Sequence, residues 1–181
     1  MAQAKKRKRF FDVEIPIIKK ETQAQAYDID ELEGKFIKYD LTRILKGKGM
    51  LLSLKIHVNE GKAIALPREM RLMPYFLKRM VRKGTNYIED SFSMKCKDAQ
   101  IKIKPFLITR RKVPRAVRKA LRNKAKEELV SYIEGKSSEE LFEDIINNRI
   151  QKPLSLKLKK IYPLSLCEIR VFKVEKNLEK P

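Results

Sequence analysis

Apolar and polar residues alternate along much of the first two thirds of the chain, with the period of two that is typical of β-strands. This pattern predicts strands over residues 10–18, 34–46, 50–58, 86–95 and 99–109. Gly47-Lys48-Gly49 separates the second segment from the third, and Lys97-Asp98 separates the last two. Because such turns favour antiparallel pairing of the strands on either side, we expect two hairpins.

The N-terminal part gives two further expectations. Residues 10–18 are apolar and β-branched and contain Pro16 near their end, which is typical of an edge strand because proline cannot donate a hydrogen bond to a neighbouring strand. Residues 19–33 are polar and lightly acidic, and we expect a loop there.

The pattern changes to helical spacing in two places. A helix is expected from Pro74 to Lys83, because proline suits the first helical position and Gly84 favours helix termination. The longest helix is expected over residues 114–133.

The C-terminal third is expected to contain two more helices and a strand. One helix begins at Ser137 or Ser138, where Ser-Ser-Glu-Glu resembles a capping box, and a short one covers residues 153–160. Residues 166–174 read as a final strand that pairs back into the sheet. Strands first and helices later favour an α+β fold over a doubly wound sheet.

Length and composition narrow the class of protein. The chain has 181 residues, which suits one domain over residues 10–181, preceded by a basic arm at residues 1–9 that is disordered until bound. Two cysteines cannot make a disulfide framework, and one histidine with two distant cysteines cannot supply a four-ligand zinc site. No apolar run is long enough to span a membrane, and the basic N-terminus is not followed by the apolar run of a signal peptide.

Charge is the strongest signal for function. The net charge of +20 predicts a polyanionic partner. From Arg110 to Lys126 there are nine basic residues and no acidic one, whereas Glu127 to Asp144 contains seven acidic residues and one basic. Nine unopposed charges repel one another, and a nucleic acid relieves that repulsion and releases counterions. The acidic segment either faces solvent or meets a basic protein neighbour.

Two other basic clusters point the same way. Lys78, Arg79, Arg82 and Lys83 form a second basic helix face. The arm at Lys5–Arg9 is either a localisation signal or an RNA-contacting extension that becomes ordered on binding, and we favour RNA contact. The candidate RNA-binding residues are therefore Lys5, Lys6, Arg7, Lys8, Arg9, Lys78, Arg79, Arg82, Lys83, Arg110, Arg111, Lys112, Arg115, Arg118, Lys119 and Arg122.

Phe10 and Phe11 follow the arm directly. They either stack on bases or anchor the arm in the core, and we favour the core anchor.

Catalysis finds little support in the sequence. His57 lies in a predicted strand and is expected to be a structural or surface residue, and Cys96 and Cys167 are expected to pack as small apolar residues. No phosphate-binding loop occurs, and no acidic pair has the partners that would fix a metal, so we expect no cofactor and no metal. The recognition motifs of small sequence-reading modules are absent, which favours binding to RNA shape and backbone.

Several segments resemble one protein family. They are FLKRMVRKGTNYIEDSF at Phe76–Phe92, FLITRR at Phe106–Arg111 with the basic VPRAVRKALRNK after it, and IYPLSLCEIRVFKVE at Ile161–Glu175. GKFIKYDLTRIL, from Gly34, adds to them. Their order and spacing resemble the small-ribosomal-subunit family of archaea and eukaryotes called S-three-A-e, or eukaryote-type small-subunit protein one. The brevity of the chain resembles archaeal members.

The resemblance implies a cytoplasmic, ribosome-bound structural protein that is not an enzyme. Members of the family lie on the platform of the small subunit, near the mRNA exit and the 3′ end of the rRNA. They bind rRNA and touch neighbouring proteins, including small-subunit protein eleven, and mRNA is a further candidate partner; no membrane partner is expected. The family fold is a β-barrel-like mixed or antiparallel sheet with packed helices. The resemblance carries RNA contact to the basic arm and to Arg79, Arg82, Lys83, Arg110, Arg111, Arg118 and Lys119.

Charge alone leaves two alternatives open. One is a free RNA-binding factor or RNA chaperone that is not integral to the ribosome, and the other is an enzyme that acts on nucleic acid. The missing catalytic constellation argues against the enzyme. The resemblance favours the ribosomal protein over the free factor.

Overall fold

The computed structural model describes residues 7–178, and these divide into two compact units. The first unit comprises the described residues up to Tyr39 together with Leu52–Arg68, and the second comprises Asp40–Leu51 and the described residues from Glu69 onward. Strands β4 (Met50–Asn59) and β5 (Lys62–Leu72) each contribute residues to both units. The fold is α+β, as the order of predicted strands and helices indicated.

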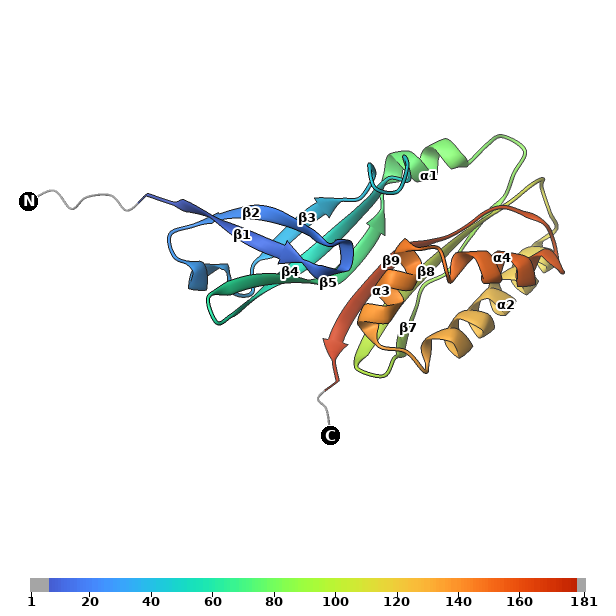
Figure 1. Cartoon of the computed structure of the whole chain (residues 1–181). Coiled ribbons are helices and arrows are strands. Elements are labelled where there is room, and N and C mark those ends of the chain that lie inside the picture. The colour runs from blue at the N-terminus through green and yellow to red at the C-terminus, as the bar shows by residue number, and fades with distance from the viewer. Residues whose placement is uncertain (1–6, 179–181) are drawn as a thin grey trace, which may run out of the picture. The chain divides into compact units, whose positions relative to one another are not determined.

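The first unit is an open five-stranded sheet (Figure 1). Its strands are β1 (Arg9–Ile15), β2 (Lys20–Ala26) and β3 (Phe36–Asp40), with the parts of β4 and β5 that belong to this unit. The order is β2-β1-β5-β4-β3, with β1 antiparallel to β2 and parallel to β5. Short 3-10 turns lie at Pro16–Ile18 and Ile29–Leu32. Alternate residues of the strands are buried, among them Val13, Ile15, Leu54 and Ile56.

Two expectations for this region are wrong. Residues 10–18 do not form an edge strand, because β1 has β2 on one side and β5 on the other. Residues 19–33 are not a loop, because β2 pairs with β1 without a break from Arg9↔Ala26 to Ile15↔Lys20. In KETQAQA the less exposed residues Thr22, Ala24 and Ala26 alternate with polar ones, but they are too small to give a clear hydrophobic signal, and the strand is fixed by backbone hydrogen bonds to β1.

The second unit pairs its strands antiparallel and adds all four α-helices. The end of β5 pairs with β9 (Leu164–Asn177), β9 with β8 (Ala99–Thr109), and β8 with both β6 (Tyr87–Glu89) and β7 (Phe92–Lys95). The hairpin partner of β8 across the turn at Lys97-Asp98 is the four-residue β7, as that turn indicated. The final strand does pair back into the sheet.

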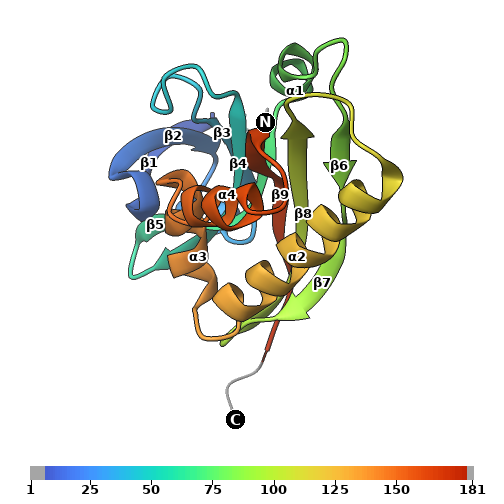
Figure 2. The same ribbon diagram turned by 90° about the vertical axis from the view of Figure 1, so that its right-hand side faces the viewer.

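Three helices cover one face of β8 and β9: α2 (Arg115–Ile133), α3 (Ser138–Ile146) and α4 (Gln151–Lys159) (Figure 2). The core lies between these layers. Phe142 of α3 packs edge-on against Phe172 of β9, with ring centroids 4.7 Å apart, and Ile101 and Ile103 of β8 are fully buried. Lys102 and Lys104 therefore lie on the other face of β8, as their alternation predicted.

The barrel that the family resemblance implied is not present in the described residues. A barrel requires its first and last strands to pair. In the first unit the edge strands β2 and β3 do not pair with each other. In the second unit the order of paired strands, β5-β9-β8-β6, ends at β6. The sheet is mixed and open.

Helix α1 (Pro74–Met80) is shorter than expected. It begins at Pro74 as predicted but ends at Met80, because Val81 has an extended backbone. Arg82 and Lys83 therefore lie in the loop after α1, and the expectation of one basic helix face that includes them is wrong. The reason is tertiary: Asn86, a few residues further on, is fixed to the end of β8 by hydrogen bonds that involve Thr109.

Candidate nucleic-acid interface

The first half of α2 carries an exposed stripe of basic side chains. Arg115, Lys119, Arg122 and Lys126 follow the spacing i, i+4, i+7, i+11, which places them on one face of the helix. Leu121, Ala125, Leu129 and Ile133 recur every four residues and hold the helix against the unit through a different face. None of the four stripe residues has an ion-pair partner among residues 7–178, so their charges are available to a ligand.

Arg118 differs from its neighbours on α2. It is half-buried, and its Nε is buried without a hydrogen-bond partner in the described part of the chain. At 100° per residue Arg118 falls within the arc spanned by the four buried residues of the helix, which agrees with its partial burial. Its side chain is thus held by packing, whereas the stripe residues extend into solvent.

Two basic loops are bound together beside α2. The hydroxyl oxygen of Thr109, fully buried at the end of β8, lies 3.0 and 2.7 Å from the carbonyl oxygens of Asn86 and Arg111, and its single proton can be donated to either. Asn86 N–H donates back to Thr109 Oγ1 at 3.0 Å, and Asn86 Oδ1 accepts from Val113 N–H at 2.8 Å. This network fixes the loop that carries Arg82 and Lys83 against the loop 110–113.

The structure therefore brings three of the predicted basic groups into one region of the second unit. Arg110, Arg111 and Lys112 are exposed in the bend before α2, and Arg82 and Lys83 are exposed in the adjoining loop. Neither Asn86 nor Thr109 was singled out in the sequence, because a polar pair becomes meaningful only when the fold places its members together. We call the stripe on α2 and these two loops the α2 basic surface.

The remaining predicted residues of α1 are placed differently. Lys78 is exposed, and Arg79 donates a long hydrogen bond to the carbonyl oxygen of Gly47 at 3.4 Å. The guanidinium carbon of Arg79 also lies 5.6 Å from the centroid of the Phe76 ring. Arg79 thus contributes to holding the loop 41–49 as well as carrying charge.

An open groove of about 830 Å³ adjoins α2 at Arg122. Its cationic lining is Arg71, Lys102, Lys104, Arg122, Arg170 and Lys173. Arg71 pairs with Glu69, Arg170 with Glu89 and Lys102 with Glu175, whereas Lys104 and Lys173 have no ion pair in the part of the chain that the structure describes. Sequence reasoning missed this groove because the register of β8 with β9, which sets Lys102 directly opposite Lys173, joins distant segments.

The basic arm is only partly described. Lys5 and Lys6 lie outside the described residues. Arg7, Lys8 and Arg9 are exposed, and Arg9 is the first residue of β1, so the expected arm ends one residue earlier than its predicted limit. The expectation that Phe10 and Phe11 anchor the core is wrong for Phe10, which is exposed, while Phe11 is half-buried.

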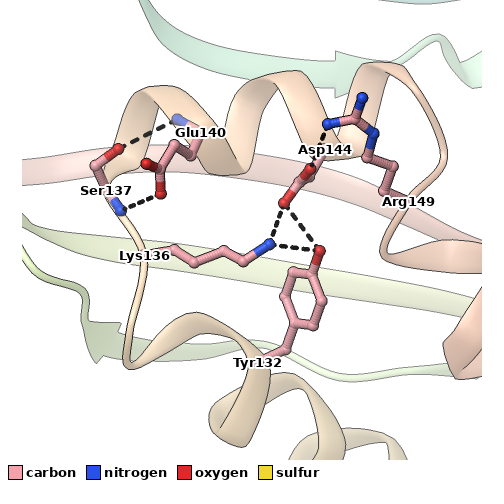
Figure 3. A network of polar contacts seen from close by, with 6 residues as sticks. All are labelled: Tyr132, Lys136, Ser137, Glu140, Asp144 and Arg149. Atoms are coloured by element: carbon pink, nitrogen blue, oxygen red, sulfur yellow. Dashed lines mark hydrogen bonds and ion pairs between the residues drawn. The ribbon is translucent and has the colours of Figure 1, made fainter.

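Much of the acidic segment 127–144 is engaged within the second unit. Glu128 pairs with Lys157 at 2.5 Å, and the capping box predicted at the start of α3 is confirmed, with Ser137 as N-cap and Glu140 as its partner. Asp144 accepts from Tyr132 and Lys136 and pairs with Arg149 (Figure 3). Burial alone would raise the pKa of Asp144, but hydrogen bonds from Lys136 and Tyr132 outweigh it and hold that pKa below its usual value.

Comparison with known proteins then decides the family. The sequence matches the Ribosomal S3Ae family over residues 2–177. The chain belongs to that family.

Curated relatives of this ribosomal family agree with the match. A protein named small ribosomal subunit protein eS1 from Nanoarchaeum equitans is 28% identical over 94% of this chain and 90% of its own length. Proteins of the same name from Saccharolobus solfataricus (28% identical, over 86% of this chain and 78% of that protein) and Pyrobaculum aerophilum (29%, over 76% and 63%) are also similar. The resemblance seen in the sequence to archaeal members is confirmed.

Membership of the Ribosomal S3Ae family makes the chain a structural ribosomal protein of the cytoplasm rather than an enzyme. His57 is half-exposed and its Nδ1 lies 3.1 Å from Glu33 Oε1, an ordinary surface contact. Cys96 and Cys167 are both buried, as expected, and burial together with the charge of Glu168 raises the pKa of Cys167 to about 12. Residues 7–178 contain no group of three or more side chains suited to a metal ion and no helix long and apolar enough to cross a membrane.

Proposed function

We propose that this chain binds small-subunit rRNA through the α2 basic surface of its second unit and so supports the structure of the subunit. The observation that carries the proposal is the segregation of charge on α2 and the loops bound beside it. Nine basic residues from Arg110 to Lys126 stand without an acidic one, and of these only Lys124 has an ion pair among residues 7–178, with Glu127 and Glu128. Lys and Arg in this number neutralise phosphates and release counterions.

The test compares two variants of equal charge. Arg115→Gln/Lys119→Gln/Arg122→Gln removes three charges from the α2 basic surface, and Lys152→Gln/Lys159→Gln/Lys160→Gln removes three from exposed positions at α4. Filter binding of the full chain to small-subunit rRNA is measured over a range of salt concentrations. If about six phosphates are contacted, log K falls with log salt at a slope near −5, and the α2 variant makes that slope shallower by about 3.

The control variant reveals whether position or only net charge matters. We expect its slope to stay near that of the natural chain. Equal losses in both variants, or a slope near zero for the natural chain, would contradict binding at the α2 basic surface.

We further propose that the chain lies on the platform, near the mRNA exit and the 3′ end of the rRNA, beside small-subunit protein eleven. The support is the family resemblance of the closing segment Ile161–Glu175 and the name of the relatives. Because both native cysteines are buried, Lys112→Cys provides a single exposed thiol for tethered iron-EDTA. Hydroxyl-radical cleavage of assembled subunits near the 3′ end of the rRNA is expected, and cleavage confined to other regions argues against this placement.

The alternative is a free RNA-binding factor. Sucrose-gradient sedimentation of a lysate separates the two functions, because an integral ribosomal protein travels with small subunits and resists a high-salt wash. A chain that remains at the top of the gradient favours the free factor.

A further inference from the structure

An aromatic ring stands exposed on the first unit beside the basic end of β1. Phe10 is 67% exposed, although its neighbour Phe11 is half-buried on the other face of the strand. Tyr27, which directly follows β2, is 39% exposed. Single exposed apolar residues are common, but neighbouring aromatic rings on one surface are typical of a binding site.

The strand register places these two rings on the same face. Phe10 lies opposite Gln25 in the β1–β2 pair, which ends at Arg9↔Ala26, and Lys8 and Tyr27 are the residues just beyond that end. The ammonium of Lys8 lies 5.6 Å from the centroid of the Tyr27 ring, in agreement with this register. Phe10 and Tyr27 are thus diagonal cross-strand neighbours, within reach of one ligand.

We propose that Lys8, Phe10, Gln25 and Tyr27 form a site for the unstacked bases of single-stranded RNA. The proposal rests on the proposed function, since it adds a base contact to a protein that binds RNA by its phosphates. We call these four residues the β1–β2 platform.

The chemistry of the four side chains fits such a ligand. Aromatic rings on an open sheet face stack on bases, and every base offers a ring face, so the contact tolerates different sequences. The Gln25 amide can donate to or accept from a base edge. Lys8, with the exposed Arg7 and Arg9 beside it, supplies positive charge for the phosphates that connect those bases. A duplex does not offer its base faces, so the platform selects single strands.

Charge also limits the length of the site. Beyond Phe10 the same face of β1 carries Asp12 and then Glu14, and Glu14 lies opposite Glu21 of β2. Phosphates that continued along the strand would meet these carboxylates. The platform therefore accommodates a short stretch of nucleotides at the basic end of the pair, and a longer strand must leave the sheet there.

The experiment uses the full chain and two probes, a short single-stranded oligouridine and a duplex RNA of equal length. Phe10→Ala is compared with Phe36→Ala, because Phe36 is 64% exposed on β3 of the same unit but is not part of the platform. Loss of one stacking contact weakens oligouridine binding by roughly 5- to 150-fold. We expect that loss for Phe10→Ala alone, with duplex binding and the salt slope unchanged, and we expect Phe10→Tyr to restore binding.

A third probe reports the stacking directly. The fluorescence of 2-aminopurine placed in the oligouridine reports on stacking, and its change on binding should be lost in Phe10→Ala and kept in Phe36→Ala. Circular dichroism and thermal unfolding of each variant show that it is folded. The inference is overturned if Phe10→Ala and Phe36→Ala bind oligouridine equally, or if Phe10→Ala affects only assembly with subunit proteins.

This outcome is separable from that of the proposed function. A shallower salt slope in the Arg115→Gln/Lys119→Gln/Arg122→Gln variant tests the α2 basic surface, whereas Phe10→Ala changes affinity at constant slope. If the salt-slope test contradicts the α2 basic surface, the Phe10→Ala test of the β1–β2 platform remains valid, and the reverse also holds.

Discussion

At the scale of single residues, Lys48 forms a largely buried ion pair with Glu168. Its Nζ lies 2.6 Å from Glu168 Oε2 on β9 and 2.8 Å from Asn148 Oδ1 between α3 and α4, and both charged side chains are largely buried. In the sequence Lys48 stands between Gly47 and Gly49 and reads as part of a turn. The fold makes it the residue that ties the loop 41–49 to the sheet.

We expect Lys48→Met to destabilise the protein by about 3 kcal/mol, because it leaves the Glu168 carboxylate buried without its cation. Chemical denaturation of the full chain measures the free energy of unfolding. The double variant Lys48→Met/Glu168→Met is the control, since replacing a whole buried pair costs less than removing one member. A Lys48→Met single variant that unfolds at the same denaturant concentration as the natural chain would contradict this role.

Asp144 gives the protein a predictable response to acid. Because its pKa is lower in the folded chain than in the unfolded one, its carboxylate stabilises the fold above the unfolded value of about 4, and this contribution is lost as the pH falls through the folded pKa. In Asp144→Asn we expect the free energy of unfolding to be lower at neutral pH and to change less between about pH 5 and pH 3.

The matched control is Glu143→Gln, because Glu143 lies next to Asp144 on α3 but is exposed. Urea denaturation at several pH values distinguishes the two. If Asp144→Asn and Glu143→Gln lose stability in parallel with the natural chain as the pH falls, the network around Asp144 does not account for the acid response.

At the scale of secondary-structure elements, the pairing of β1 with β2 contains one repulsive contact that a substitution can remove. Glu14 and Glu21 lie directly opposite each other, and like charges in that position destabilise a strand pair. We expect Glu21→Lys to stabilise the protein by about 0.5 kcal/mol, with Glu21→Gln intermediate. Thermal unfolding checks the order of the three proteins, and a melting temperature that falls in Glu21→Lys contradicts the expectation.

Elements were predictable from the sequence where their own apolar side chains pack in the core, because the spacing of those residues shows the type of element. Leu121 and Ala125 indicate α2 by their spacing, and Ile101 with Ile103 indicates β8 by alternation. β2 was not predicted, because Thr22, Ala24 and Ala26 on its less exposed face are small and give little hydrophobic signal, and its pairing with β1 cannot be read from the segment itself. The end of α1 was missed for a related reason, since the position of Asn86 is set by Thr109 of β8.

At the scale of the whole molecule, charge indicated the nature of the partner but not the arrangement of the groups that meet it. The sequence identified the basic residues of α2 and of the two loops, and their runs are visible without a fold. It did not indicate that Asn86 and Thr109 bind the loops together, nor that β8 and β9 line a groove with lysines. These features depend on register between segments far apart in the chain. Periodicity within one segment carries no information about that register.

The cross-strand pair of Lys102 and Lys173 affects the stability of the protein before it is bound. Glu175 pairs with Lys102 at 3.5 Å, but Lys173 opposite it has no ion pair in the part of the chain that the structure describes, and an anion that binds only the folded form stabilises that form. Binding of an anion and stability against unfolding are then linked, because the free energy of binding adds to the free energy of unfolding. Under the proposed function, a copy without bound RNA would lack that stabilisation, would unfold more often and would be degraded before an assembled copy.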